Sequence, residues 1–586
     1  MSKRGSAVHV STHRRHYTGK DGTERVYQTH LLRRSYRQDG KVKNETVANL
    51  SHLPAETIEV IRASLAGETL VKASAAATVT RSVPHGHVAA VWAQAKALGL
   101  PALLGPAGRY RDLAMALIIA RVVRPASKLA TTNWWADTTL GVDLGVAGAG
   151  TDETYAAMDW LLARQDVIEA KLAARHLASG PNPSRMALFD LTSAWMEGSH
   201  CPLAARGYSR DGKKNRAQIE YGLLTDPAGR PVAVRVFAGN TADPTAFIAS
   251  VQVVRTKFGL KDLVMVGDRG MITSARITAL REHTDLGWLT ALRAPQVAKL
   301  AEQDGPLQLS LFDEFDLAEI THPDYPGERL VACRNPALAA ERARKREDLL
   351  TATESVLAPI AAAVNAGRLT GSDQIGLKVG KVINKYKMAK HFQVQITQDT
   401  FQAQRRSEAI QAEAALDGIY VLRTNTPADH LDAAGVVTAY KNLSHVERDF
   451  RTIKVDDLAL RPIHHRLEDR VRAHVLIAML AAYLTWHLRR AWAPLTFTDQ
   501  HPPVRDNPVA PAQRSAAATR KASRRQDEHG QPVRSFRALL EHLGTLTRND
   551  IQYGTQGPVV PTLAVPTPTQ RRAFELLDQP VPATLK

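Results

Sequence analysis

Short apolar runs separated by turns dominate residues 184–292 and give the clearest hydrophobic pattern of the chain. Runs at 186–193, 218–224 and 231–237 have the length and composition of strands. A turn at 226–229, with the sequence Asp-Pro-Ala-Gly, separates the second run from the third and predicts an antiparallel hairpin. This part of the chain therefore opens with three predicted strands.

Four further elements follow in the same stretch. They are a helix that begins at Asp243-Pro244, a strand at 263–267, a helix near 274–283 and a strand at 287–292. Asp243 is a suitable N-cap, and proline is favoured at the first helical position. The order β-β-β-α-β-α-β, followed by a later helix, is that of the RNase H-like fold. We therefore expect an α/β protein with an RNase H-like catalytic core.

Three acids occupy special places in this pattern. Asp190 follows the apolar run 186–189, Asp268 follows the run 263–267, and Glu447 lies in the helical stretch 440–454. Apolar runs that end in an acid are typical of core strands that deliver a carboxylate to the edge of a sheet. Three such acids suit a phosphoryl-transfer site with two metal ions. Carboxylate oxygens are also the ligands that Mg²⁺ prefers.

The patterns outside this stretch divide the whole chain into six regions. They are a small basic β unit (1–75), a helical, candidate DNA-binding domain (76–180), the first part of the core (181–293), a mixed insertion (294–416), the second part of the core with the Glu447 helix (417–494) and a Pro-rich, basic C-terminal tail (495–586). The helical domain is equally able to serve only in packing. The start of the tail has the composition of a linker or disordered segment, before a short helix near 534–543.

Charge and cysteine content narrow the class of protein. The 76 Lys and Arg exceed the 58 Asp and Glu, for a formal charge of +18, which points to nucleic acid or an acidic membrane as partner, or to a merely basic protein. Cys201 and Cys333 are the two cysteines, too few for a disulfide framework or a zinc site. The longest apolar stretch has ten residues, from Val475 to Leu484, too few to span a bilayer. We expect a soluble cytoplasmic protein.

The stretch around Glu447 predicts an amphipathic helix. At 100° per residue, Tyr440, Glu447, Arg451 and Lys454 fall on one narrow arc, beside a separate apolar stripe. Taken alone, this arc is typical of a solvated face with a Glu447–Arg451 ion pair, which contributes only a few tenths of a kcal/mol. The combination with Asp190 and Asp268 favours a functional face instead.

The same residues carry a resemblance to a known family. Tyr440, Glu447 and Lys454 match the signature Tyr-x2-Arg-x3-Glu-x6-Lys of DDE transposases from bacterial insertion sequences, in the insertion-sequence-four-like group, with Leu443 at the Arg position. Other matching pieces are Leu188-Phe-Asp190-Leu-Thr-Ser193, Gly207-Tyr-Ser-Arg-Asp-Gly-Lys-Lys-Asn215, Gly239-Asn-Thr-Ala-Asp243 and Val266-Gly-Asp268-Arg-Gly-Met271. The long separation of Asp268 from Glu447 is similar to that of a subgroup with a large insertion before the Glu helix.

The resemblance implies a site and a reaction. Asp190, Asp268 and Glu447 would be the catalytic acids and bind two Mg²⁺ ions, with Mn²⁺ expected to substitute. Tyr440 and Lys454 would hold phosphates of double-stranded DNA at the element ends. Leu443 fits a packing position, so Arg448 or Arg451 is expected to supply the missing charge. The implied reaction cuts at the ends of a mobile element and joins 3′-hydroxyls to target DNA, with a homodimer as the expected synaptic form.

Two groups of lysines are further candidates for DNA contact. Lys213 and Lys214 lie in a polar stretch that predicts a loop near the active-site edge, with a plain surface hairpin as the alternative. The second group lies in an acid-free stretch of the insertion and comprises Lys378, Lys381, Lys385 and Lys387. Lysine contacts with phosphate are a main source of sequence-independent affinity for DNA. A solvated face is the alternative for this second group.

Three other functions remain open at this point. A basic DNA-binding protein on an inactive RNase H-like scaffold would account for the charge, although the acids at all three positions argue against it. A metal-dependent nuclease or resolvase would use the same site to cleave without joining. A tyrosine recombinase with Tyr440 as nucleophile would leave Asp190 and Asp268 without a role.

Overall fold

The computed structural model describes most of the chain. The described residues are 7–18, 20, 24–38, 41–68, 77–178, 185–198, 200–213, 215–260, 263–273, 277–278, 286–302, 305–554 and 556–585. Lys214 and most of the predicted helix at 274–283 lie outside them. The chain forms two compact units, one of Met1–Ser82 with Arg548–Leu563 and one of Val83–Thr547 with Ala564–Lys586.

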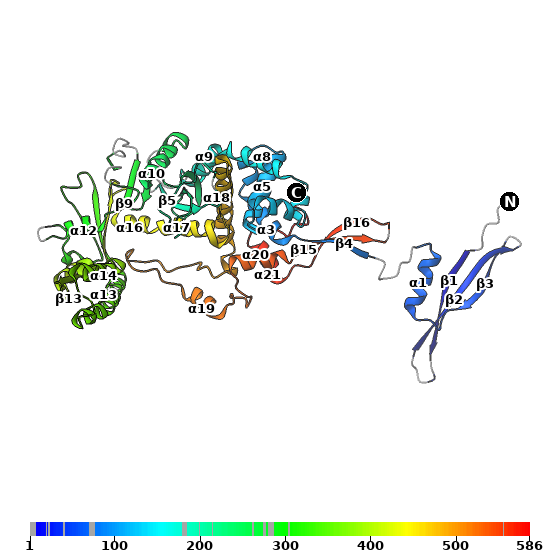
Figure 1. Cartoon of the computed structure of the whole chain (residues 1–586). Coiled ribbons are helices and arrows are strands. Elements are labelled where there is room, and N and C mark those ends of the chain that lie inside the picture. The colour runs from blue at the N-terminus through cyan, green and yellow to red at the C-terminus, as the bar shows by residue number, and fades with distance from the viewer. Residues whose placement is uncertain are drawn as a thin grey trace. The chain divides into compact units, whose positions relative to one another are not determined.

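The smaller unit contains two three-stranded sheets (Figure 1). Its first sheet has the order β1-β2-β3, formed by β1 (Ala7–Thr18), β2 (Glu24–Gln38) and β3 (Lys41–Asn49). Helix α1 (Ala55–Leu65) packs against β1 and buries Ile58. A second sheet has the order β16-β15-β4, from β4 (Ala77–Pro84), β15 (Thr547–Tyr553) and β16 (Val559–Leu563). In these sheets β1 with β2, β2 with β3, and β15 with β16 pair antiparallel.

The larger unit is organised around an eight-stranded sheet with the order β10-β11-β14-β9-β8-β5-β6-β7. The strands are β5 (Met186–Trp195), β6 (Gln218–Thr225), β7 (Pro231–Ala238), β8 (Leu263–Gly267), β9 (Leu286–Ala291), β10 (Leu317–Ile320), β11 (Arg329–Arg334) and β14 (Ile419–Thr424). Strand β8 is parallel to both β5 and β9, and the other pairings are antiparallel. Helix α10 (Asp243–Gln252) and the π-helical turn Val253–Lys257 connect β7 to β8.

The first part of the predicted insertion belongs to this sheet, and the rest folds outside it. Strands β10 and β11 extend the sheet beyond β14, because β11 pairs with β14. The chain then forms the helices α13 (Pro336–Asn365) and α14 (Ser372–Tyr386), the hairpin of β12 (Phe392–Ile396) with β13 (Phe401–Arg405), and α15 (Ser407–Ala414). These elements have a small core of their own, which includes Leu357, Ile375 and Val379.

The two ends of this excursion are joined to each other. The backbone N–H of Asn335 donates to the carbonyl of Gly418 at 2.9 Å, and the Asn335 side chain caps α13 by accepting from Leu338 N–H at 3.0 Å. Gly418 has a φ of +77°, and a Cβ there would lie 2.4 Å from the Asn335 carbonyl oxygen. A glycine is therefore required at this crossing.

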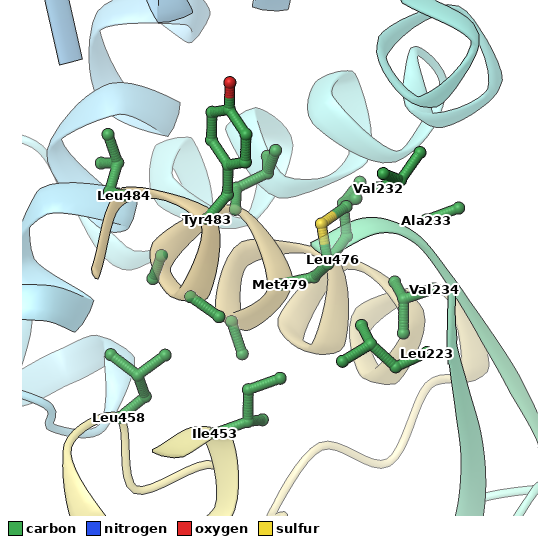
Figure 2. Close-up of a cluster of buried hydrophobic side chains, with 14 of the residues drawn as sticks. Leu223, Val232, Ala233, Val234, Ile453, Leu458, Leu476, Met479, Tyr483 and Leu484 are labelled. Carbon is green, nitrogen blue, oxygen red and sulfur yellow. The ribbon is translucent and has the colours of Figure 1, made fainter. Parts of the chain in front are cut away.

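A long buried helix connects the sheet to the helical part of the unit. Helix α18 (Glu468–Ala491) packs against β7, and also against α5 (Arg109–Val123) and α8 (Thr151–Leu162). Figure 2 shows Leu476 and Met479 of α18 among side chains of β6, β7 and the segment after α17 (Leu443–Arg451). Helix α18 is long and apolar enough to cross a membrane, but it is mostly buried in the core, as in a soluble protein. The other helices of this part are α3 (Gly86–Ala97), α4 (Leu100–Leu104), α6 (Lys128–Trp135), α7 (Thr139–Leu144) and α9 (Gln165–His176).

The C-terminal tail is more structured than its composition predicts. The short helix expected near 534–543 is present as α20 (Phe536–Gly544). The stretch expected to be a linker contains α19 (Ala516–Arg524), and α20 is not the last helix, because α21 (Pro568–Glu575) follows. In α19 the ammonium of Lys521 donates to the carbonyls of Ala493 and Thr498, each at 2.9 Å. Basic residues thus anchor this segment, and α20 buries an apolar face in the main core.

Candidate active site

Two of the three acids lie side by side on adjacent parallel strands, Asp190 in the middle of β5 and Asp268 where β8 ends. Strands β5 and β8 pair in a register that places Phe189 beside Gly267. The next residue on each strand is an acid, Asp190 on β5 and Asp268 directly after β8. Neighbouring strands are about 4.8 Å apart, so this register brings the two carboxylates to one place on the sheet edge.

The third acid lies on a helix that covers this part of the sheet. Helix α17 (Leu443–Arg451) packs against β5 and β6, and the ring of its Phe450 meets Tyr221 edge to face at 5.6 Å. Glu447 is exposed on this helix. Helix α16 (Ala433–Lys441) precedes α17, and the hydroxyl of its Tyr440 donates to Asp268 Oδ1 at 3.3 Å.

The predicted helix over 440–454 is interrupted twice. Asn442 ends α16 and begins α17, and its carbonyl accepts from the N–H of His445 at 2.8 Å. A π-helical turn at Thr452–Asp456 follows α17, and it contains Lys454. The single arc of polar residues expected from an ideal helix is therefore replaced by three short segments.

Electrostatics connect the three acids. Burial raises the pKa of Asp190 to about 7, and the negative charges of Asp268 and Glu447 raise it as well, while the Leu191 N–H and the Arg210 guanidinium act in the opposite direction. The Leu191 N–H donates to Asp190 Oδ1 at 2.7 Å. Burial and then the charge of Asp268 raise the pKa of Tyr440 above its usual range. A cation at this edge would relieve the repulsion among the acids.

Lys454 points to a buried acid of another segment. Its ammonium donates to Asp211 Oδ1 and to Thr192 Oγ1, both at 2.8 Å. Asp211 also pairs with Arg461 and accepts from the Trp195 N–H at 3.3 Å. Burial lowers the pKa of Lys454, and Asp211 opposes that shift.

The comparisons with known protein families fit this geometry. Residues 184–484, just over half of the chain, match the family of the transposase DDE domain. The chain belongs to the DDE transposases. Residues 16–78 of the transposase match the N-terminal domain of the IS1634 family of transposases. A search among curated proteins finds no significant match.

Membership of this family establishes the class of reaction. The transposase cleaves DNA and transfers strands, and DNA is its partner. The DDE domain also implies an RNase H-like fold, in agreement with the mixed α/β architecture. DDE transposases use divalent metal ions such as Mg²⁺.

The acids of the transposase fit such an ion in their chemistry. Their donor atoms are hard carboxylate oxygens, and the charge repulsion at Asp190 favours a cation. Among the described residues, no three His, Cys, Asp or Glu side chains converge as a preformed metal cage. Mg²⁺ keeps several waters and is usually held by one or two carboxylates together with substrate phosphates, so a closed protein cage is not required.

The remaining residues of the Glu447 helix have different surroundings. Leu443 is half-buried and packs against the main core, as its predicted packing role requires. Arg451 is exposed. Arg448 lines a cavity of about 740 Å³ together with Asp449 and Trp486, and Glu447 is not part of that lining.

Among the described residues, no contact joins the predicted lysines to the three acids. The Lys213 ammonium lies 5.9 Å from the centre of the Trp195 ring. The other group is exposed on or just after α14 of the insertion and comprises Lys378, Lys381, Lys385 and Lys387. Lys214 lies outside the described residues.

Two residues near the acids were not predicted from the sequence. Arg210 affects the pKa of Asp190 and forms an ion pair with Glu220 at 3.4 Å. Asp211 holds Lys454 and Arg461, as described above. Both belong to the stretch 207–215, and the resemblance of that stretch to the family was the only sequence signal for them. In that stretch the sequence pattern favoured Lys213 and Lys214 as candidates instead.

Proposed function

We propose that Asp190, Asp268 and Glu447 are the catalytic acids of this transposase and hold two divalent ions, Mg²⁺ with Mn²⁺ able to substitute. The observation that carries the proposal is geometric: the register of β5 with β8 places Asp190 beside Asp268, and α17, which carries Glu447, packs against β5. The charges of Asp268 and Glu447 also raise the pKa of Asp190. In sites of this kind the ions activate the attacking hydroxyl or water and stabilise the leaving oxygen.

Protein residues around the acids have positioning roles in this proposal. The Tyr440 hydroxyl fixes Asp268 by donating to Oδ1. Asp211 holds the Lys454 ammonium beside Thr192, next to the acid-bearing part of β5. From this position Lys454 is able to contact a DNA phosphate, and Asp211 limits its motion. The Arg210 guanidinium keeps positive charge near Asp190.

We place the transposase in the insertion-sequence-four-like group, in the subgroup with a long insertion before the Glu helix. Tyr440, Glu447 and Lys454 support the placement, and Leu443 is the departure from the signature. Arg451 is the better substitute for the missing Arg, because it is exposed one turn after Glu447, whereas Arg448 lines the cavity beside Asp449. The exposed lysines of α14, together with Lys213 and Lys214, would extend the DNA path.

The proposed reaction joins the 3′-hydroxyls of two element ends to target DNA. Because both ends must be held together, a homodimer is the proposed synaptic form. The transposase would act on cytoplasmic, nucleoid-associated DNA.

Incubation with Mg²⁺ and a labelled fragment that bears the inverted repeats of its own locus tests the proposed function. We expect joined products. Cleavage without joining would favour a nuclease or resolvase, and retention without cleavage would favour an inactive DNA-binding protein.

Asp268→Ala tests the assignment of the acids. We expect this variant to lose cleavage and joining and to keep DNA binding, because the change removes a carboxylate of the site without removing a cation. Asp469→Ala, at an exposed acid in the first turn of α18, is the matched control and should retain activity. Cleavage by Asp268→Ala at the wild-type rate would show that the three acids are assigned wrongly.

A further inference from the structure

The first sheet of the smaller unit has two chemically different faces. Side chains alternate between the faces of a strand, and directly paired residues share a face. Thr12 pairs with His30 and lies on one face, where the Thr12 hydroxyl and a ring nitrogen of His30 are 2.9 Å apart. The Arg62 guanidinium of α1 donates to the same hydroxyl. Helix α1 therefore covers this face, which we call the covered face.

The acids of the sheet are confined to the covered face. Glu24 pairs with Thr18, and Glu45 pairs with Arg34, which in turn pairs with Val8. Thr18 and Val8 are an even number of residues from Thr12, so all these positions share its face. The described strands carry no Asp or Glu on the opposite face, which we call the open face.

The open face combines cations with polar and aromatic groups. Its residues on the three strands include His9, His13, Arg15, Tyr17, Arg25, Tyr27, Thr29, Arg33, Arg37, Asn44 and Thr46. Paired Ser35 and Asn44 confirm the assignment, because the Ser35 hydroxyl donates to Asn44 Oδ1 at 2.6 Å across the strands. An acid-free surface with guanidinium, amide and hydroxyl groups is complementary to a polyanion that also has hydrogen-bonding edges.

The outer half of the β1–β2 hairpin is a two-stranded ribbon. Strand β3 pairs with Leu31–Gln38 of β2, so in the described part of the chain residues 13–18 and 24–29 have no third strand beside them. Arginine and tyrosine alternate across the open face of this ribbon: Arg15 pairs with Tyr27, and Tyr17 pairs with Arg25. Both tyrosines are more than half exposed, at 57% and 54%.

We infer that this ribbon enters the major groove of DNA at the element ends, with Arg15 and Arg25 reading base edges. The inference deepens the proposed function, which supplies the element ends as the DNA concerned. Two strands about 4.8 Å apart fit a major groove about 12 Å wide, and a two-stranded ribbon is an established shape for that groove. Arginine contacts guanine through two parallel hydrogen bonds, the commonest base-specific contact. Tyr27 and Tyr17 are the cross-strand partners of the two arginines.

The test compares the two faces of this sheet in the full-length protein. Binding is measured by fluorescence anisotropy in EDTA, with an element-end duplex and a scrambled duplex of equal length. Arg15→Ala/Arg25→Ala should reduce the preference for the element end by about tenfold or more, since one good bidentate contact discriminates by at least that order. The control Arg14→Ala/Arg34→Ala removes two exposed arginines from the covered face. This control should weaken binding to both duplexes by the same factor and keep the preference for the element end.

A second variant separates base reading from charge and from misfolding. Arg15→Lys/Arg25→Lys keeps both charges but loses the planar fork of the guanidinium. It should bind the scrambled duplex as wild type does and still lose the preference. An unchanged preference in both open-face variants would overturn the inference.

Two further results are decisive. If vesicles that contain anionic lipid bind the wild type but not the open-face variants, and the preference for the element end is unchanged, the ribbon is a membrane contact and the inference fails. A parallel cleavage assay in Mg²⁺ tests the proposed function separately. Wild-type protein that prefers the element end through Arg15 and Arg25 but never cuts it would overturn the catalytic proposal and leave the ribbon assignment standing.

Discussion

The substitution Asp211→Asn should destabilise the larger unit and weaken catalysis together. The Asp211 side chain is only 1% exposed, and it pairs with Lys454 and Arg461, whose side chains are 11% and 23% exposed. Asparagine keeps the shape but removes the charge that balances two cations. Breaking a fully buried pair costs about 3–5 kcal/mol, and an exposed pair contributes less than about 1 kcal/mol. Because the two cations keep some contact with solvent, we expect a loss of about 2–4 kcal/mol.

Urea denaturation and the DNA cleavage assay measure the two effects. Asp159→Asn is the control, because Asp159 pairs with Arg470 at 2.7 Å but is 48% exposed, and its loss should cost less than about 1 kcal/mol. At a urea concentration where the variant is folded, cleavage should still be slower than in wild type, since Lys454 is no longer held beside Thr192. Equal denaturation midpoints for Asp211→Asn and wild type would refute the reasoning.

Two other substitutions test the surroundings of the site and the core. The Tyr440 hydroxyl donates a long hydrogen bond, 3.3 Å, to the Asp268 carboxylate. Tyr440→Phe removes this bond, so the Mg²⁺ concentration that gives half-maximal cleavage should rise by about tenfold. An unchanged Mg²⁺ midpoint with weaker DNA binding would instead make Tyr440 a phosphate ligand. Lys128 is buried beside His474 and Arg121, and burial holds its pKa well below the usual range. Lys128 therefore binds its proton more tightly in the unfolded chain than in the folded protein. The free energy of unfolding of the wild type should then fall by up to about 1.4 kcal/mol per pH unit as the pH drops from about 10 towards the pKa of Lys128 in the folded protein. Guanidinium denaturation at pH 9 and pH 7 should show a smaller fall for Lys128→Met, and equal falls would contradict this assignment.

Local apolar patterns predict the central strands well. The run at 263–267 coincides with β8, and the runs at 186–193 and 231–237 differ from β5 and β7 only at their ends. Strand β8 is buried on both faces and its residues are apolar without interruption, whereas β5 and β7 are mostly buried and contain single polar positions such as Asp190 and Arg235. The pairing of β11 with β14 was not predicted, because it joins segments about 90 residues apart.

The candidate site was predicted in part. Acids that follow apolar runs are visible as local patterns, and Asp190 and Asp268 do lie on or directly after adjacent strands. Strand β5 nevertheless continues beyond Asp190 to Trp195, so only Asp268 is at a strand end. Their catalytic roles and that of Glu447 remain predictions. Helical periodicity assumed one ideal helix, and it did not anticipate the interruption at Asn442 or the π-helical turn that contains Lys454. Asp211 lies in a polar loop, and only the folded chain shows that it is buried against Lys454.

The hydrogen bond between Asn335 and Gly418 has a consequence for how such chains diverge. It closes the base of the excursion formed by α13 to α15, so residues on either side of the crossing meet whatever the length of chain between them. Insertions and deletions within that excursion leave β11 and β14 in place. The length of the excursion can therefore change without moving β14, the strand from which the chain continues to the Glu447 helix.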